Sequence, residues 1–354
     1  MDIIKTRLLS QQLNATQLNT PAEVVGWMAA IQAQDYRMMR WAVAMRMKNP
    51  SLAAFEKAYN QGDIVRIHLM RGTWQLVTRE DLPYWIALCG KRSAAVIKGW
   101  MNANKIIISE EEIQKVRTIM ASLMHGRRNV MKAEIAETLQ SQGMGMDDHR
   151  VSYHIRFAEV EGWICSGDLD KTKPTYCLVE EKIGPLPQVD ETEALERLTR
   201  KYFMSRGPAT MEDYMWWSGL PKTLCQQGLA MIADELNVVN INNDSYYIHN
   251  TCRHRGAKKG GVLLLPPFDE YLIGYKSRYH ALKPEHTAFA HTNNGIFYPI
   301  VAVNGKIVGN WKPTSKDGEI TLFEHDVDCC RESLDTAFTQ FSLAKKGKAA
   351  DSKR

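Results

Sequence analysis

The chain has 354 residues, of which 44% are hydrophobic and 24% charged, a composition typical of a globular protein with two or three domains. No run of about 18 apolar residues occurs and the first nine residues lack a signal-peptide segment, which argues against a membrane protein and predicts a cytoplasmic one. The net charge is +5, and residues 1–100 hold 13 Lys and Arg against seven Asp and Glu, so this segment can present a positive face to a polyanion.

The first hundred residues predict helices followed by a two-stranded hairpin. Thr20, Pro21 and Glu23 mark the start of a helix that we expect to run to residue 33. Further helices are expected over 4–14, 36–47 and 51–59, and strands over 64–70 and 74–77. This order of elements is typical of a winged helix.

A second copy of the pattern follows. We expect a short helix over 131–140, a turn through Gly143 and Gly145, and a longer helix from Asp147 to Glu161. Strands over 163–165 and 175–179 complete a helix, turn, helix, wing order.

A third copy begins after the Gly184-Pro185-Leu186-Pro187 linker. Its expected helices cover 191–204, 210–218 and 222–236. Its expected strands, 238–241 and 246–248, flank the turn Asn242-Asn243-Asp244, which is a strong hairpin signal.

The remaining chain, 262–327, is rich in predicted strands, with turns at Asn304-Gly305 and Asp317-Gly318, and indicates a small sheet or partial barrel. The fold class is therefore α+β, with three tandem winged-helix units and a C-terminal β-rich region. The expected divisions are 1–100, 101–187, 188–261, 262–344 and a basic disordered tail over 345–354. This tail either adds weak phosphate attraction or does nothing specific.

Five phrases stand in a recognisable order along this chain. They are Ile31-Gln32-Ala33-Gln34-Asp35-Tyr36, Leu69-Met70-Arg71-Gly72-Thr73-Trp74, Ser205-Arg206-Gly207-Pro208-Ala209-Thr210, the stretch from Pro266 to Tyr275, and Val308-Gly309-Asn310-Trp311-Lys312. Together, over roughly residues 5–340, they resemble the bacterial winged-helix DNA-binding superfamily that includes the AlkZ/YcaQ-type DNA glycosylases. The resemblance implies three winged helices that form a C-shaped body around a DNA channel.

The resemblance also implies catalytic residues. Glycosylases of this family carry a Gln-Φ-Gln or Gln-Φ-Asp motif in which Φ is aliphatic, and Gln32-Ala33-Gln34 resembles the first form. We expect both Gln side chains on one side of an extended connector, with Ala33 packed inward. An N7-alkylated guanine is cationic and already a good leaving group, so neutral amides that position water and hydrogen-bond the sugar can suffice. The resemblance thus implies a monofunctional DNA glycosylase that excises bulky N7-alkylated purines or unhooks crosslinks.

Two alternatives remain open at this site. Gln32 and Gln34 could simply cap the helix over 21–33 or bond to backbone. Asp35 is a rival carboxylate base if it faces the same pocket, although a shift of one residue can point it away. Asp269 and Glu270 suggest a second carboxylate pair, but adjacent residues on a strand face opposite ways, so we expect them to be structural.

Basic residues near the predicted helices and wings are the candidates for phosphate contact. The predicted DNA-binding residues are Arg37, Arg40, Arg66, His68, Arg71, Arg150, His154, Arg253 and Arg255. Four of them have a plainer interpretation: His68, like Trp74, fits a strand core, Arg71 fits a structural turn, and Arg253 and Arg255 fit a solvated loop.

No metal or cofactor is expected. The seven cysteines contain no Cys-x-x-Cys pair, and His280, His286 and His291 lack a ligand framework. The expected partner is double-stranded DNA, alkylated or crosslinked, bound by a monomer because no dimerisation heptad is visible. The alternative functions are a non-catalytic winged-helix DNA-binding protein or regulator and a protein-interaction module.

Overall fold

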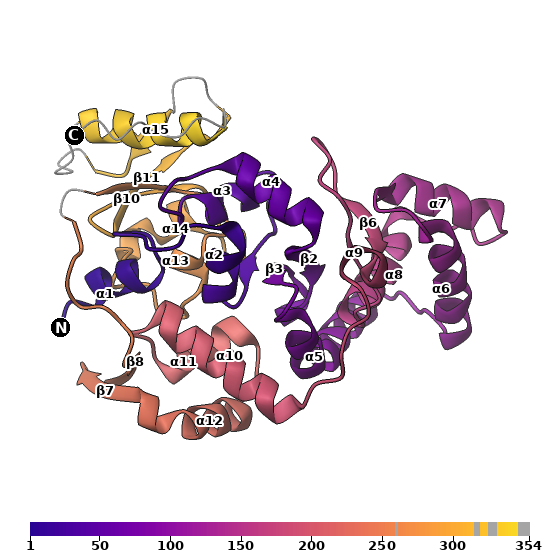
Figure 1. Cartoon of the computed structure of the whole chain (residues 1–354), viewed down its shortest axis with the longest axis horizontal. Coiled ribbons are helices and arrows are strands. Elements are labelled where there is room, and N and C mark those ends of the chain that lie inside the picture. Colours follow the sequence, from indigo (N-terminus) through magenta and orange to yellow (C-terminus); the bar gives the residue numbers. More distant parts are fainter. Residues whose placement is uncertain (259–260, 315–318, 325–330, 346–354) are drawn as a thin grey trace. The chain divides into compact units, whose positions relative to one another are not determined.

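The computed structural model describes residues 1–258, 261–314, 319–324 and 331–345. The chain forms two compact units, here called unit 1 (Met1–Phe55 with Glu196–Arg354) and unit 2 (Glu56–Leu195). The boundary between Phe55 and Glu56 falls inside the predicted first division 1–100: the helices before residue 52 belong to unit 1 and the hairpin over 64–78 belongs to unit 2. The predicted domain divisions stay a prediction. Helices α4 (Leu52–Gln61) and α10 (Glu191–Arg206) carry the chain between the units (Figure 1).

Unit 1 begins with short helices whose ends follow local signals. Thr20 and Glu23 form the predicted capping box, in which each side chain accepts a hydrogen bond from the other residue's backbone N–H. This helix ends at Trp27 rather than at residue 33, because Ala29 adopts a left-handed backbone with φ of 60°. The elements here are α1 (Ile3–Ser10), α2 (Pro21–Trp27), the two-residue strand β1 (Ile31–Gln32) and α3 (Met39–Ala44).

The two short helices and the hairpin predicted over 210–248 lie in unit 1. Gly219, at φ 69°, ends the first of these helices in the left-handed conformation that glycine tolerates. Asn242 and Asn243, at φ 48° and 70°, form the hairpin turn, whereas Asp244 of the predicted turn is the first residue of β8. The elements are α11 (Met211–Ser218), α12 (Lys222–Met231), the short 3-10 helix η2 (Ala233–Glu235), β7 (Leu236–Ile241) and β8 (Asp244–His249).

The C-terminal part of unit 1 is an antiparallel four-stranded sheet in the order β12-β11-β10-β9. Neighbouring residues face opposite sides: Leu265 packs with Tyr271 and Leu8, whereas Leu264 packs with Trp41 and Phe341 of a C-terminal helix. This helix was not predicted from the sequence. The elements are β9 (Val262–Leu265), α13 (Glu270–Ile273), η3 (Pro284–His286), α14 (Thr287–Ala290), β10 (Ile300–Val303), β11 (Lys306–Trp311), β12 (Ile320–Leu322) and α15 (Arg331–Lys345). The predicted turn Asp317-Gly318 and tail residues 346–354 lie outside the described residues.

Unit 2 contains the hairpin predicted over 64–77 and the helices and strands predicted over 131–179. Its hairpin pairs β2 (Ile64–His68) with β3 (Trp74–Thr78) across η1 (Met70–Gly72). Its second sheet has the order β4-β6-β5, where β5 and β6 are the predicted wing. The other elements are α5 (Leu82–Ala103), α6 (Glu110–Met124), β4 (Val130–Met131), α7 (Lys132–Ser141), α8 (Asp148–Val160), β5 (Ile164–Ser166), β6 (Thr175–Leu178) and α9 (Val179–Ile183). The core between α6, α7 and α8 includes Val116, Ile135 and Ile155.

Candidate functional site

The Gln-Ala-Gln segment lies in unit 1 on a connector with little regular structure. After α2 ends, the backbone turns through Met28 and Ala29 and becomes extended at Ile31–Gln32. Such a segment cannot satisfy its peptide groups within itself, so they need partners from elsewhere in the fold.

Two side chains from distant parts of the sequence bond three of these peptide groups. Nη1 of Arg206 donates to the carbonyl of Met28 at 2.9 Å, and its Nη2 donates to the carbonyl of Ala30 at 2.9 Å. Oε1 of Glu270 accepts a hydrogen bond from the backbone N–H of Gln32 at 2.8 Å. Arg206 and Glu270 are themselves paired, with the Nε atom 3.1 Å and the Nη2 atom 2.5 Å from Oε2.

This Arg206–Glu270 pair is completely enclosed, with side-chain exposures of 0% and 1%. A buried ion pair is tolerable only when its remaining donors and acceptors are bonded. The indole Nε1 of Trp217 donates to Glu270 at 2.9 Å, and the Arg206 guanidinium lies 4.2 Å over the Trp217 ring. The guanidinium also donates to Oγ of Ser205 at 2.8 Å.

A second buried pair lies beside the first. Arg46 donates to both carboxylate oxygens of Asp269, at 2.9 and 2.8 Å, and their side-chain exposures are 0% and 1%. Its other hydrogen bonds go to the backbone carbonyls of Gln11 and Ala42 and to the Gln11 side chain. Asp269 and Glu270 stand at the start of α13 rather than on a strand, and each carboxylate is paired with an arginine.

The two glutamines differ in their surroundings. Gln32 is 6% exposed and Ala33 is fully buried, whereas Gln34 is exposed to solvent. Ala33 is thus packed inward as expected. Gln32 lies in the buried strand β1, so the two glutamine side chains differ in exposure, and their position on one side of the connector stays a prediction.

Asp35, the rival carboxylate, is used by the local backbone. Its Oδ1 accepts hydrogen bonds from the N–H groups of Arg37 at 2.9 Å and Met38 at 2.8 Å. This arrangement caps the turn that leads into α3. The Asp35 carboxylate is therefore oriented toward the backbone of Arg37 and Met38.

Among the predicted DNA-binding residues of unit 1, Arg37 and Arg255 are exposed and Arg40 and Arg253 are half-buried. Arg253 donates to the carbonyl of Ala15 at 3.0 Å. These positions allow phosphate contact by at least the exposed guanidinium groups.

Three of the predicted DNA-binding residues of unit 2 are buried instead: Arg66, His68 and His154. Arg66 donates to Oγ of Ser166 at 3.2 Å and lies 4.2 Å over the Trp74 ring. His68 pairs through Nδ1 with Glu159, and burial lowers its pKa although Glu159 opposes the shift. The exposed fractions of Arg66 and His68 are 1% and 2%, so these two side chains have almost no surface to offer a phosphate.

The buried His154 shares a carboxylate with Arg150, and Arg150 and Arg71 are half-buried. Arg150 donates from Nε to Glu112 at 2.7 Å, and the Nε2 atom of His154 lies 2.8 Å from the same carboxylate. The hydrogen bond from Arg150 and the bond to His154 hold the pKa of Glu112 below its usual range. Arg71 is half-buried in the turn between β2 and β3, with a left-handed backbone at φ 57°.

The sequence interpretation missed a basic helix surface and the anchoring residues. No Asp or Glu occurs from Leu82 to Ser109, and Lys91 and Lys98 are exposed on α5 at a spacing of seven, which puts them on one face. The absence of acids over 28 residues was the available signal. Arg206 and Glu270 belong to the sequence segments that carry the family resemblance, but no pattern in the neighbouring residues indicated that they contact Gln32.

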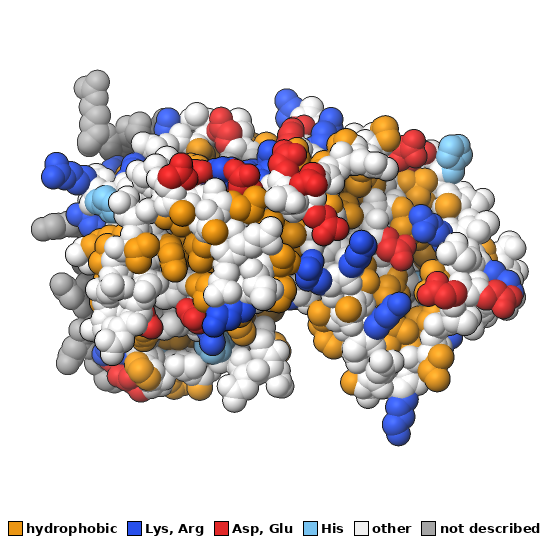
Figure 2. All heavy atoms as spheres, turned by 90° about the horizontal axis from the view of Figure 1, so that it is seen from below, with side chains coloured by type: hydrophobic (Ala, Val, Ile, Leu, Met, Phe, Trp, Pro, Cys, Tyr) orange, Lys and Arg blue, Asp and Glu red, His pale blue; other side chains and the backbone are white. Residues whose placement is uncertain are grey.

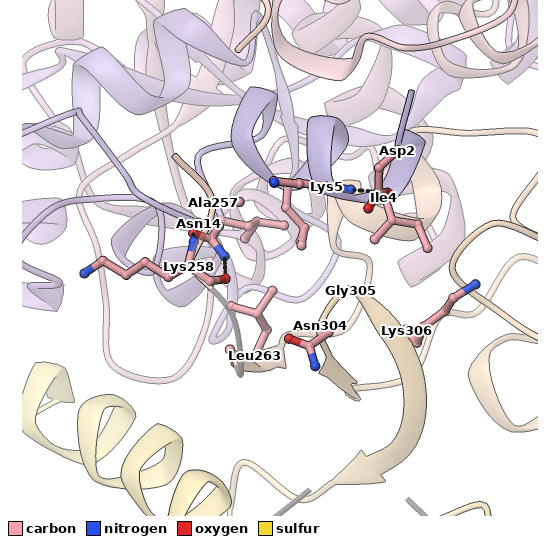
Figure 3. A pocket seen from close by; sticks show the side chains of 13 residues that line it. Asp2, Ile4, Lys5, Asn14, Ala257, Lys258, Leu263, Asn304, Gly305 and Lys306 are labelled. Carbon is pink, nitrogen blue, oxygen red and sulfur yellow. Dashed lines mark hydrogen bonds between the residues drawn. The ribbon is translucent and has the colours of Figure 1, made fainter. Parts of the chain in front are cut away.

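The surface drawn in Figure 2 mixes charged and hydrophobic side chains, and a hollow lies elsewhere in unit 1. Figure 2 shows Lys and Arg side chains interspersed with acidic and hydrophobic ones on the face it draws. A hollow of about 730 Å³ in unit 1 lies beside the start of α1, and Figure 3 shows Lys5, Asn14 and Lys306 around it. Its lining contains none of the predicted catalytic or DNA-binding residues.

Within the described ranges, no cluster of three His, Cys, Asp or Glu side chains could hold a metal ion. In the same residues no helix is long and apolar enough to cross a bilayer. The absence of a metal or cofactor requirement stays a prediction.

The chain is similar to known proteins in both sequence and structure. A family model described as DNA glycosylase AlkZ-like matches residues 25–342. An interstrand DNA cross-link repair glycosylase from Streptomyces sahachiroi is 22% identical over 333 residues, which cover 90% of this chain and 88% of that protein. The solved structure of the Streptomyces sahachiroi DNA glycosylase AlkZ has a TM-score of 0.80 and 20% identity, covering 98% of this chain and 97% of that one. At this identity the structural likeness establishes a shared mixed α and β fold.

Proposed function

The chain belongs to the AlkZ-like DNA glycosylase family, and from this premise we propose that it hydrolyses N-glycosidic bonds of bulky N7-alkylated purines in duplex DNA and unhooks crosslinks. The observation that carries the proposal is the Gln32-Ala33-Gln34 segment, which lies inside the matched residues 25–342. The backbone of Gln32 and of the preceding Met28 and Ala30 is hydrogen-bonded to a buried ion pair. The name of the Streptomyces relative supports crosslinked DNA as one substrate.

The proposed chemistry needs little acid catalysis. When the bond between the sugar and the purine breaks, its electron pair neutralises the alkylated base, and positive charge develops on the sugar. Water then forms the new bond to the sugar carbon and releases a proton to solvent. An amide has both donors and an acceptor, so Gln34 can orient the water while it hydrogen-bonds the sugar as charge develops.

Gln34 is the member of the pair that we place at the reacting sugar, because its side chain is exposed whereas Gln32 is 6% exposed. Gln32 is proposed to line the site from the buried side. Asp35 is not assigned as the base, since its carboxylate accepts two backbone hydrogen bonds.

DNA contact is proposed for winged-helix units and for accessible cations. The winged-helix units are α7, α8 and the β5–β6 hairpin, α11, α12 and the β7–β8 hairpin, and the helices and hairpin within residues 1–100. Phosphate contacts are assigned to Arg37, Arg40, Arg253 and Arg255, with Lys98 added from α5. We propose that the protein acts as a monomer.

The test is incubation with duplex DNA that contains N7-methylguanine, followed by alkali to cleave abasic sites. Wild-type protein is expected to produce strand breaks at the modified guanine and none in an unmodified duplex. Protein that binds the duplex but releases no base would instead be a non-catalytic DNA-binding protein.

A further inference from the structure

We propose that Arg206 and Glu270 are positioning residues for catalysis: together they fix the backbone of residues 28–32 and thereby place the glutamine pair at the sugar. The inference rests on the proposed glycosylase function. Arg206, Glu270 and Gln32 form one hydrogen-bonded cluster. They come from three of the five sequence segments named above, which lie far apart along the chain.

The first argument is the closed circuit of bonds. The guanidinium of Arg206 spans from the carbonyl of Met28 to that of Ala30, and the carboxylate that it pairs with takes the N–H of Gln32. The connector is therefore held on both its acceptor and its donor groups by one ion pair. Since Ala29 has a left-handed backbone, the turn between the two bonded carbonyls is sharp and is held on both sides.

The second argument is that the Arg206 and Glu270 side chains are rigidly held, so the connector bonded to them is rigidly held as well. Arg206 and Glu270 are buried, and the remaining bonds of Glu270 and Arg206 go to Trp217 and Ser205. A carboxylate with three donors around it and a guanidinium fixed by carbonyls have little freedom to rotate. Displacement of a catalytic group by about 1 Å can slow a reaction about 100-fold, so this rigidity bears directly on the rate.

The third argument is the contrast with the neighbouring pair. Arg46 and Asp269 are equally buried and also paired at hydrogen-bond distance, yet their further hydrogen bonds go to Gln11, Ala42 and Tyr271. A purely structural role would make the two pairs equivalent. A positioning role makes only the Arg206–Glu270 pair matter for the rate.

The experiment compares Arg206→Lys with Arg46→Lys in the full chain. Lysine keeps the charge but cannot span two carbonyls and a carboxylate, so both variants lose similar bonds at similar burial. Melting temperature, duplex affinity and single-turnover release of N7-methylguanine at saturating protein are measured for each. We expect Arg206→Lys to slow release about 10- to 100-fold beyond any effect of Arg46→Lys, with duplex affinity unchanged. Equal rates in the two variants would overturn the proposal.

A second variant covers the case in which Arg206→Lys does not fold. Glu270→Asp keeps the negative charge beside Arg206 but withdraws the carboxylate from the N–H of Gln32, and it is expected to slow release about tenfold or more. Release at the wild-type rate would overturn the proposal.

Hydrogen exchange of the amides of residues 28–34 supplies a readout that does not need activity. Exchange is expected to become faster in Arg206→Lys and Glu270→Asp and to stay unchanged in Arg46→Lys. If wild-type protein releases no base, the proposed function fails, while unchanged exchange in all three variants overturns the positioning role itself.

Discussion

The Nε2 atom of His280 lies 2.8 Å from the hydroxyl of Tyr246, which in turn lies 2.9 Å from the hydroxyl of Tyr279. Burial, with the nearby charges of Arg7 and Lys306, lowers the pKa of His280 to about 4. Burial likewise raises the pKa of Tyr246. Both groups are therefore neutral near pH 7, and the contact joins an uncharged imidazole to an uncharged phenol.

This pair predicts a stability that depends on pH. Because the folded-state pKa of His280 is below that of an unfolded histidine, the unfolded chain binds the proton more readily at acidic pH. The contribution of His280 is fully present above about pH 6.5 and is lost as the pH falls toward 4. Urea midpoints at pH 7.5 and 4.5 should differ less in His280→Gln than in wild type. An identical pH difference in both proteins would contradict the prediction.

Asp213 predicts a large loss of stability on a minimal substitution. Its buried carboxylate accepts hydrogen bonds from the N–H groups of Thr210, Lys276 and Ser277 and pairs with Arg7 at 3.4 Å. Asp213→Asn removes the charge that balances Arg7 and turns one acceptor into a donor. We expect the free energy of unfolding to fall by about 3 kcal/mol. Asp244→Asn, at the exposed first residue of β8, is the control and should change it by less than about 0.5 kcal/mol.

Basic residues should separate into those that bind DNA and those that support the fold. Arg255→Ala and Lys98→Ala remove exposed cations, so each should weaken duplex binding about equally on unrelated sequences and reduce the salt slope by about 1. Arg66→Ala removes a buried side chain that contacts Ser166 and Trp74, so it should lower the melting temperature instead. Salt-dependent affinity measurements and thermal denaturation check the two classes. A flat salt response of wild-type binding would refute this assignment.

The local signals in the sequence predicted the local structure well. The turn at Asn242-Asn243 and the two strands predicted over 64–70 and 74–77 correspond to hairpins, because turn residues and strand-forming residues act within a few positions. The helix from Pro21 was predicted too long, since Met28 and Ile31 continue a helical apolar spacing and only the left-handed Ala29 breaks it. Both residues are buried all the same.

The site was predictable only in part. The Gln-Ala-Gln triplet was found through the resemblance, but its anchoring depends on contacts over 176 to 238 positions that no local pattern encodes. A basic side chain was also an insufficient indication of DNA contact at Arg66 and His68, because every residue of β2 is buried and these side chains contact the protein interior. Sequence pattern gives the side-chain type, whereas tertiary packing decides whether that side chain meets solvent.

The glutamine assignment gives the most direct prediction for the enzyme. If Gln34 orients water and stabilises the developing charge on the sugar, Gln34→Ala should reduce the release of N7-methylguanine about 10- to 1000-fold. Affinity for undamaged duplex should barely change, because a neutral side chain contributes little to phosphate attraction. Gln32→Ala should reduce release comparably, with a larger loss of stability because Gln32 is buried.

Asp35→Asn is the matched comparison for this prediction. The Asn carbonyl oxygen can still accept the hydrogen bonds from Arg37 and Met38, so the turn into α3 should persist while the carboxylate charge is lost. Release measured under single-turnover conditions should then stay within about threefold of wild type. If Asp35→Asn abolishes release and Gln34→Ala leaves it intact, the carboxylate is the catalytic base, and the amide mechanism proposed for Gln34 is wrong.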